Sequence, residues 1–367
     1  MSTRVSLPGP TVRPLRGDDQ PRDLRQGLVD RFGRRGTDLR ISLIDKCNLR
    51  CTYCMPAEGL PWLSRSQLLA AEEIRRLVRI GVEVLGIREL RLTGGEPLVR
   101  HDLVEIISGI RRDHPELPIA MTTNAVGLQH KAAQLREAGL DRVNVSLDSI
   151  HQETFNELTR RDNLHRVLEG VAAAEAAGLT PLKINAVLLR GINDTQASEL
   201  LAWALGHNYQ LRFIEQMPLE ADQTWKREKL VTAAETRELL SRHYRLSPAA
   251  EDRDGAPAEK FIVWDKDGSA ASPIGTVGII ASATEPFCAD CTRTRITAEG
   301  RVMSCLFSRE EQDLRSLLRD PHASDDDVAH SWAAAMWVKP AAHGTDTAGF
   351  DRPGFSRPTR SMSAIGG

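Results

Sequence analysis

Six cysteines fall into two groups of three, and this arrangement limits what the chain can fold into more than any other feature. They are Cys47, Cys51, Cys54, Cys288, Cys291 and Cys305. An even number of cysteines in a short secreted chain indicates disulfides, but this chain has 367 residues and shows no apolar signal segment. Two tight groups with no cysteine left over favour two metal or cluster sites. We therefore expect a cytoplasmic protein whose thiols bind metal.

The first group has the spacing Cys47-x3-Cys51-x2-Cys54 and directly follows a predicted strand. Three thiolates at this spacing can bind three corners of a 4Fe–4S cluster, for which four cysteines are the usual ligands. The fourth iron is then open to a substrate or cofactor. Structural zinc normally takes four protein ligands, and no histidine close in sequence completes the set, although the fold could bring His101 or His114 near. The spacing favours a cluster and leaves zinc open.

The second group, Cys288-x2-Cys291-x13-Cys305, spans a predicted β-hairpin. A turn at residues 298–300 places residue 293 opposite Cys305, so Cys305 returns beside Cys291 at the open end of the hairpin. All three thiols can therefore converge despite the long gap in sequence. On spacing alone, a zinc clip on a basic strand is as good an interpretation as a cluster.

Two arginines accompany this second group. Side chains alternate between the faces of a strand, so Arg293 and Arg295 share the face of Cys291. Guanidinium groups pair well with phosphate. The pattern therefore predicts an anionic ligand beside the second cysteine group.

Between residues 39 and 217, short apolar runs alternate with segments of helical spacing, which indicates repeated βα units. The expected strands are 39–44, 89–93, 118–123, 142–148, 181–189 and 210–217. The expected helices are 70–86, 102–112, 128–138, 163–177 and 195–206. Each expected strand ends near a polar or reactive side chain, and the active sites of (β/α) barrels lie at these ends. We expect an α/β fold with an incomplete (β/α)6 TIM-like barrel.

Composition and local pattern divide the chain into four parts. We expect a disordered N-terminal extension without an assigned role, a partial barrel, a smaller C-terminal α+β domain with the second cysteine group, and a Pro/Gly-rich tail. Their boundaries are 1–36, 37–230, 231–340 and 341–367. The net charge of −2 indicates no broad nucleic-acid surface, and no apolar run approaches the ~20 residues of a membrane helix.

The first cysteine group belongs to a wider pattern, with Tyr53 between its last two cysteines and Gly94-Gly95-Glu96-Pro97 after the second expected strand. This combination resembles the radical S-adenosylmethionine (SAM) superfamily. The resemblance implies that the open iron chelates the amino and carboxylate groups of SAM. One electron then cleaves SAM to methionine and a 5′-deoxyadenosyl radical, a chemistry that belongs to the cofactor.

The second group, with its Cys-x2-Cys-x-Arg-x-Arg pattern and a terminal Gly366-Gly367, resembles the GTP 3′,8-cyclases, which begin molybdenum cofactor (molybdopterin) biosynthesis. The resemblance covers residues 38–367 and adds several matching stretches. These are 45–51, 53–56, 91–98, 145–148, 212–218 and 362–367. It implies two 4Fe–4S clusters with GTP between them, and conversion of GTP to (8S)-3′,8-cyclo-7,8-dihydroguanosine 5′-triphosphate.

The resemblance also implies roles for individual residues. Four are expected to bind SAM: Tyr53, Gly95, Ser146 and Met217. Six are expected to bind GTP: Arg40, Arg91, Thr122, Lys183, Arg293 and Arg295. The catalytic group comprises Arg293, Arg295, Gly366 and Gly367. From the residues alone, an inward-facing Lys183 favours function because a buried unpaired lysine is costly. Arg40 is more readily a surface strand residue, Ser146 and Thr122 could equally cap turns, and Met217 is more often core.

The implied partners are GTP, an electron donor such as flavodoxin or ferredoxin, and a downstream cyclic pyranopterin monophosphate synthase; a homodimer stays open. No nucleic acid or membrane is expected. One alternative is another radical SAM enzyme with an auxiliary cluster, such as a peptide maturase. A second is a zinc-stabilised binding protein, which iron content and colour would distinguish.

Overall fold

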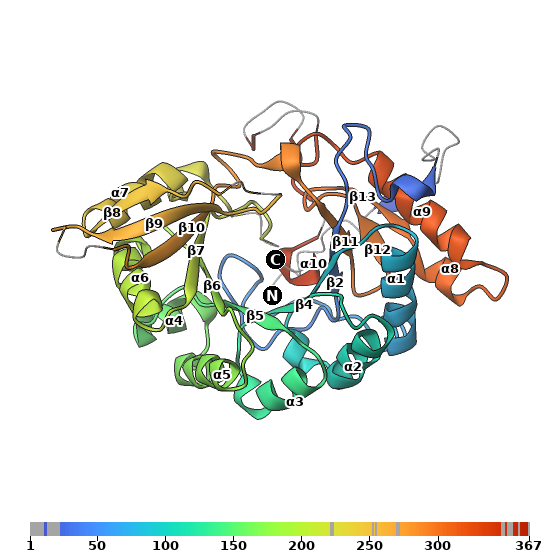
Figure 1. Ribbon diagram of the computed structural model, residues 1–367, viewed down its shortest axis with the longest axis horizontal. Helices are drawn as coiled ribbons and strands as arrows, with labels where there is room; N and C mark the ends of the chain where they lie inside the picture. The colour runs from blue at the N-terminus through green and yellow to red at the C-terminus, as the bar shows by residue number, and fades with distance from the viewer. Residues whose placement is uncertain are drawn as a thin grey trace, which may run out of the picture.

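Six parallel strands, each followed by one or more helices, form the centre of the molecule (Figure 1). In the computed structural model, these strands pair side by side in chain order. They are β2 (Asp38–Ser42), β3 (Glu89–Thr93), β4 (Ile119–Thr123), β5 (Arg142–Ser146), β6 (Lys183–Val187) and β7 (Gln210–Ile214). The structure describes residues 11–12, 23–220, 224–251, 253, 255–268, 272–345, 349–350, 355–358 and 360–365. The expected partial α/β barrel is confirmed.

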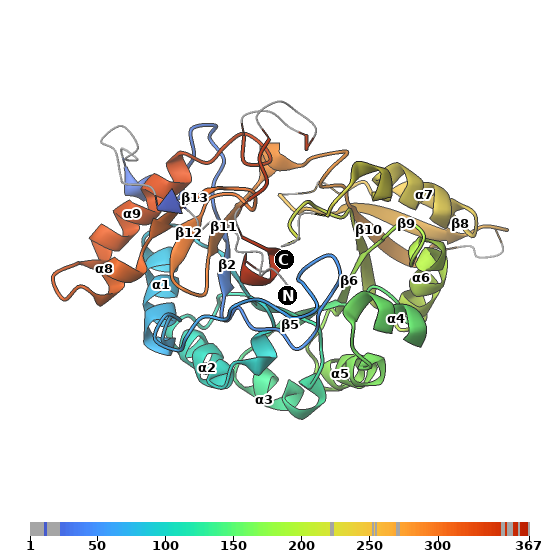
Figure 2. The same cartoon turned by 180° about the vertical axis from the view of Figure 1, so that it is seen from behind.

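Helices cover the outer face of this sheet, as both views of the ribbon show (Figures 1 and 2). They are α1 (Ala71–Glu83), α2 (Leu103–Asp113), α3 (Ala132–Glu137), α4 (Gln152–Thr159), α5 (Leu164–Ala176) and α6 (Ala197–Gly206). Short 3-10 turns precede or join several of them: η3 (Pro97–Val99), η4 (Leu128–His130) and η5 (Asp194–Gln196). Because side chains alternate along a strand, Leu39 and Ile41 of β2 are fully buried in the core shared with the helices, while Arg40 faces the barrel interior.

The C-terminal part of the chain extends the same sheet at both edges. β10 (Gly275–Ile280) pairs in parallel with β7, and β11 (Arg293–Ile296) pairs in parallel with β2. Antiparallel strands continue outward from each: β9 (Glu259–Asp265) and β8 (Tyr244–Pro248) on one side, β12 (Arg301–Met303) and β13 (Glu310–Asp313) on the other. The described strands form one sheet of order β1-β13-β12-β11-β2-β3-β4-β5-β6-β7-β10-β9-β8, in which β1 is Thr11–Val12.

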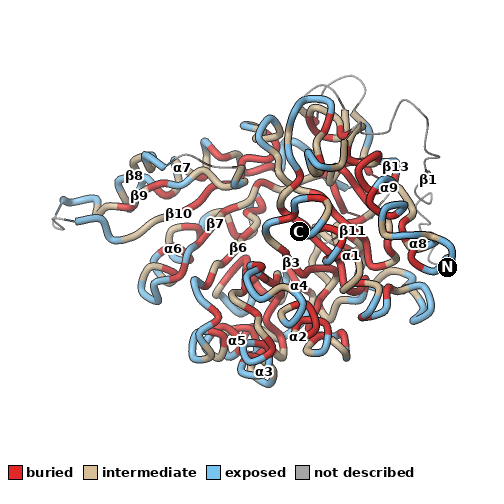
Figure 3. Tube along the Cα trace, turned by 45° about the vertical axis from the view of Figure 1, so that its right-hand side comes forward, coloured by how far each residue is buried: buried red, intermediate tan, exposed pale blue. Residues whose placement is uncertain are grey.

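The remaining helices pack on these two extensions. They are η6 (Arg227–Lys229), α7 (Ala233–Ser241), η7 (Cys288–Asp290), α8 (Arg315–Arg319), α9 (Asp325–Trp337) and α10 (Met362–Ile365), with η2 (Leu24–Gln26) near the start. Figure 1 places α7 beside β8 and β9, α8 and α9 outside β12 and β13, and α10 near the centre. Burial is concentrated along the strands and inner helix faces (Figure 3). Among the described helices, none is both long and apolar enough to cross a bilayer.

The hairpin formed by β11 and β12 has the expected register. Arg295 lies opposite Met303 and Ile296 opposite Val302. The paired residues end at Met303, so the pairing of residue 293 with Cys305 stays a prediction, while Cys291 and Cys305 line the same pocket.

The segment before the barrel differs from what we expected. The prediction that residues 1–36 are a disordered extension is wrong for 23–36. Leu28 is 1% exposed within the main core, and its backbone N–H donates to the carbonyl of Leu85. Asp30 is also buried and accepts hydrogen bonds from Arg34. The polar composition of the segment hid its packing, because the partner of Leu28 lies 57 residues further along the chain.

Candidate active site

One pocket inside the barrel brings the two cysteine groups together. All six cysteines line it, and none forms a disulfide. The first group enters from the loop after β2 and the second from η7 and the end of the β11–β12 hairpin. The pocket is therefore bounded by two sets of thiols from opposite ends of the sequence.

The first cysteine loop is compact and largely buried. The backbone N–H groups of Cys54 and Met55 both donate to the carbonyl of Cys51. Burial, with a contribution from Glu96, raises the pKa of Cys47 to about 11, and burial, with a contribution from Cys47, raises that of Cys54 to about 12. Coordination to a metal deprotonates a thiol outright. Three buried thiols in one compact loop therefore suit a site in which bound iron supplies the compensating positive charge.

The Gly94-Gly95 segment after β3 lies directly against this loop. Gly94 has φ 136°, and a Cβ there would meet the carbonyl oxygen of Ile44 at 2.3 Å. A Cβ at Gly95 would meet the carbonyl oxygen of Lys46 at 2.3 Å. The N–H of Gly95 donates to the Ile44 carbonyl (2.7 Å). Only glycine allows this approach, so the pair fixes the position of the cysteine loop.

Glu96 is a buried carboxylate beside the same loop. It accepts hydrogen bonds from the Thr123 hydroxyl (2.7 Å), the Asn124 backbone N–H (2.7 Å) and the Leu98 N–H (3.0 Å). Burial raises its pKa to about 7 despite these donors. The side-chain amide of Asn124 in turn donates to Asn48 in the cysteine loop. Glu96 therefore ties the end of β4 to the loop that follows β3.

The second cysteine group has a different electrostatic environment. Arg293 Nε and Nη2 lie 3.3 and 3.2 Å from the Cys291 sulfur, and Lys339 Nζ lies 3.2 Å from it. Burial opposes ionisation of this thiol, but Arg293 and Lys339 outweigh it and lower the pKa of Cys291 to about 5. Thiolate is the metal-binding form of cysteine, so Cys291 is prepared to act as a ligand.

The arrangement of the thiols bears on the choice between a cluster and a zinc ion. Within the described parts of the chain, no group of three or more His, Cys, Asp or Glu side chains is arranged around one ion. Thiolates on zinc must all lie about 2.3 Å from a single point. Cysteines on an iron–sulfur cluster instead bind different irons. Such spread thiols are compatible with cluster ligation, and among the described residues no His, Asp or Glu joins either triplet in a metal-binding group.

A group of arginines lies at the strand ends between the two triplets. Arg40, Arg91 and Arg295 line the pocket, and Arg40 and Arg295 are only 6% and 5% exposed. Asp38 lies 3.4 Å from Arg40, but the Nε atoms of Arg40 and Arg91 have no hydrogen-bond partner among the described residues. Burial and the neighbouring cations lower the pKa of Arg40. An anionic ligand would accept hydrogen bonds from Arg40 and Arg91 and add negative charge to that of Asp38.

The structure brings most of the predicted site residues together. The pocket is lined by Arg40, Tyr53, Arg91, Gly95, Thr122, Ser146, Met217, Arg293 and Arg295. The interpretation of Arg40 as a surface residue is wrong, because β2 lies between β3 and β11 and turns this side chain inward. Lys183 lies outside the pocket lining, at the amino end of β6, whereas Asn185 on the same strand lines it. Gly366 and Gly367 lie outside the described residues.

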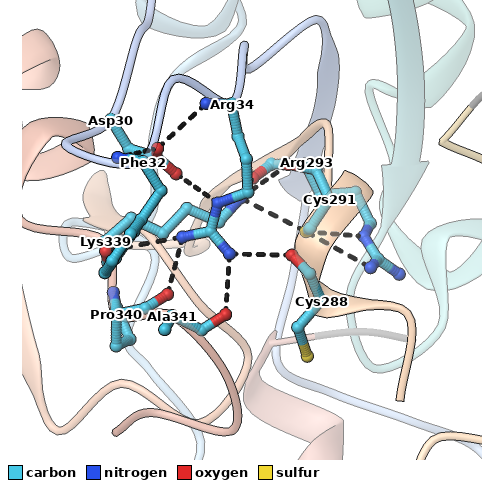
Figure 4. A network of polar contacts seen from close by, with 9 residues as sticks. All are labelled: Asp30, Phe32, Arg34, Cys288, Cys291, Arg293, Lys339, Pro340 and Ala341. Carbon is cyan, nitrogen blue, oxygen red and sulfur yellow. Dashed lines mark hydrogen bonds and ion pairs between the residues drawn. The ribbon is translucent and has the colours of Figure 1, made fainter. Parts of the chain in front are cut away.

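Among the lining residues that escaped the sequence analysis are three basic side chains, Arg34, Lys339 and His343. Arg34 falls in the segment that we dismissed as an extension. Lys339 follows the last turn of α9, where a solvated lysine is the ordinary expectation. The contacts of Arg34 and Lys339 run largely to backbone carbonyls and to sulfur (Figure 4), and such contacts leave no pattern in a sequence.

Comparison with known proteins agrees with this site. Residues 41–204 match the sequence model of the radical SAM superfamily, and residues 209–345 match that of the Molybdenum Cofactor Synthesis C family. The SAM-bound structure of SuiB from Streptococcus suis has a similar fold, with a TM-score of 0.56 at 16% identity over 79% of this chain and 67% of that one. The barrel and its first cysteine loop define a radical SAM enzyme.

The curated relatives are more specific. A GTP 3′,8-cyclase of Paenarthrobacter nicotinovorans is 66% identical over 345 residues, which cover 93% of this chain and 97% of that protein. Another from Streptomyces coelicolor is 52% identical over 93% of this chain and 96% of its own length. The chain belongs to the GTP 3′,8-cyclase family.

Proposed function

We propose that this protein converts GTP to (8S)-3′,8-cyclo-7,8-dihydroguanosine 5′-triphosphate, a lyase reaction that opens molybdenum cofactor biosynthesis. The observation that carries the proposal is a single pocket lined by both cysteine triplets and by buried arginines. Family membership supplies the reaction, and the pocket supplies a place for each reactant.

Cys47, Cys51 and Cys54 would hold one 4Fe–4S cluster, with SAM on its open iron. Bound there and reduced by a donor such as flavodoxin or ferredoxin, the cluster and SAM would supply the radical chemistry needed to remove the ribose 3′ hydrogen. Tyr53 lies within the first cysteine loop and Gly95 lies against it, and both line the pocket. Ser146 and Met217 complete the proposed SAM site from the ends of β5 and β7.

The arginines would bind GTP. A triphosphate needs several cations, and Arg40, Arg91, Arg293 and Arg295 line the pocket next to the second triplet. Thr122 at the end of β4 offers a hydroxyl. Lys183 lies outside the pocket lining and would add positive charge near the triphosphate. Burial lowers its pKa, and it is close enough to Arg212 and Arg91 for their charges to lower that pKa further.

Cys288, Cys291 and Cys305 would hold a second 4Fe–4S cluster, whose open iron would take the guanine base. The base would thus lie on one side of the pocket and the ribose nearer to SAM. The terminal Gly366-Gly367 would complete the catalytic group beside Arg293 and Arg295. Family membership carries this placement; of the described tail, Met362 and Ser363 line the same pocket, and Ser363 donates hydrogen bonds to Cys54 of the first triplet.

Anaerobic turnover tests the reaction. Reconstituted enzyme, SAM and a reductant should give methionine and 5′-deoxyadenosine together with a cyclised nucleotide when GTP is added. ATP, which has the same triphosphate but a different base, is the matched control and should give little product. Equal 5′-deoxyadenosine formation with GTP, with ATP and without nucleotide would contradict the proposal and favour a different substrate. The product itself would pass to a cyclic pyranopterin monophosphate synthase.

A further inference from the structure

Arg34 joins three distant segments beside the second cysteine group (Figure 4). Its guanidinium donates to the carbonyls of Cys288 (2.7 Å), Pro340 (2.7 Å) and Ala341 (2.8 Å), and it pairs with Asp30 at 2.5 Å. The side chain of Arg34 is 8% exposed and that of Asp30 is 1% exposed. This buried pair therefore fixes the segment after α9 against the loop that carries Cys288.

The segment held in this way supplies hydrogen-bond donors to the thiols. Lys339 Nζ lies 3.2 Å from the Cys291 sulfur, and the backbone N–H of His343 donates toward Cys288. Donors from residues 339–343 thus reach two of the three cysteines. The third, Cys305, comes from the hairpin.

Lys339 is an unusual lysine because it is buried to 2% exposure. Its three acceptors are the carbonyls of Cys291 (3.1 Å) and Arg293 (2.8 Å) and the Cys291 sulfur. A buried ammonium is costly unless a negative charge offsets it. Of these three acceptors, only the sulfur can be an anion. A thiolate at Cys291 therefore supplies the negative charge that offsets the buried ammonium of Lys339.

We propose that Lys339, held in place by the Asp30–Arg34 pair, is a positioning residue that raises the reduction potential of the second cluster. This inference rests on the proposed cluster at Cys288, Cys291 and Cys305. The potential of an iron–sulfur cluster depends on its net charge and on hydrogen bonds to its sulfurs. A fixed ammonium and its N–H···S bond favour the more negative, reduced form, and such outer contacts also orient the ligands.

Anaerobic redox titration followed by electron paramagnetic resonance tests the role of Lys339. SAM perturbs only the first cluster, so its addition separates the two signals. In K339Q, we expect the potential of the second cluster to fall while that of the first is unchanged and the iron content stays at about eight per chain. K339R keeps the charge and should restore most of the wild-type potential. An unchanged second potential in K339Q with full iron content would overturn the proposal.

R34Q tests whether the Asp30–Arg34 pair holds Lys339 in place. This variant remains informative if K339Q fails to keep its second cluster. We expect its second potential to shift in the same direction by a smaller amount. R111Q is the matched control. Arg111 lies outside the barrel and makes the same kinds of contact, with the backbone carbonyls of Gly139 and Leu117 and with the carboxylate of Asp141. Equal second potentials in wild type, R34Q and R111Q would overturn the proposal. Wild-type enzyme with about four irons per chain would overturn the second cluster itself, and this role with it.

Discussion

The phenolic hydroxyl of Tyr53 donates a hydrogen bond of 2.6 Å to a carboxylate oxygen of Asp148. Tyr53 lies in the first cysteine loop and Asp148 just beyond β5, so the bond spans the mouth of the barrel. The other oxygen of Asp148 accepts the N–H of Val187 at the end of β6. One carboxylate thus fixes the cysteine loop to two strand ends.

Asp148→Asn should weaken SAM binding about ten- to hundredfold, because a hydrogen bond to a charged group contributes about 1.5–3 kcal/mol. The amide keeps the shape of the side chain but loses the charge that holds Tyr53. Anaerobic calorimetry of SAM binding to reconstituted enzyme measures the effect. Asp113→Asn removes a carboxylate paired with Arg75 on the outer surface and serves as the control. Equal SAM affinity in the two variants would contradict the positioning role of Asp148.

Gly95→Ala should disrupt the first cluster without unfolding the protein. The new Cβ would meet the carbonyl oxygens of Lys46 and Asp45 at 2.3 and 2.4 Å, so the cysteine loop must shift. We expect a loss of about half of the cluster iron and of SAM cleavage. Gly206→Ala is the matched control, since its Cβ meets no heavy atom within 4 Å. Full iron retention in Gly95→Ala would show that this close approach does not position the loop.

Cys51→Ala and Cys291→Ala should separate the roles of the two triplets. Each variant should lose about four irons per chain, one cubane. Cys51→Ala should lose SAM cleavage altogether, whereas Cys291→Ala should still bind SAM but place GTP poorly. Iron analysis, SAM cleavage and GTP turnover measure these effects. Normal GTP turnover in Cys291→Ala would show that the second triplet has no role in substrate placement.

Lys183 should make GTP binding depend on pH. Burial and the nearby cations Arg212, Arg142 and Arg91 lower its pKa to about 8. The lysine is cationic below that value and loses its charge as the pH rises through it. The KM for GTP should therefore increase severalfold between pH 7 and pH 9. A loss of about 1.4 kcal/mol of binding free energy, which corresponds to a tenfold increase, is the upper limit that we expect. Lys183→Arg stays charged over this range and should flatten the profile. An identical increase in Lys183→Arg would assign the pH dependence to another group.

The sequence predicted the barrel well because its signals are local. Period-2 and helical spacing identified the six strands, and the polar strand ends identified the open side. Boundaries were less accurate where side chains decide them. β6 was expected over 181–189 but spans Lys183–Val187. Pro181 has no N–H to donate, and the N–H of Leu189 binds the side chain of Asn193 instead of a neighbouring strand.

Long-range features could not be predicted in the same way. Nothing in β10 or β11 indicates that they add to opposite edges of the barrel sheet, next to β7 and β2. The contacts of Arg34 with Cys288 and of Lys339 with Cys291 join residues 254 and 48 positions apart. Most of these contacts involve backbone carbonyls, which every residue has. Only the folded chain shows that the two side chains belong to the second cysteine site.

Hydrogen transfer from GTP tests the central claim most directly. Anaerobic enzyme is incubated with SAM, reductant and GTP deuterated at the ribose 3′ position, and the 5′-deoxyadenosine is examined by mass spectrometry. If both triplets and the arginines hold GTP in the shared pocket as proposed, deuterium appears in the 5′-deoxyadenosine while a cyclised nucleotide forms. Unlabelled 5′-deoxyadenosine in the same amount with and without GTP would contradict the account.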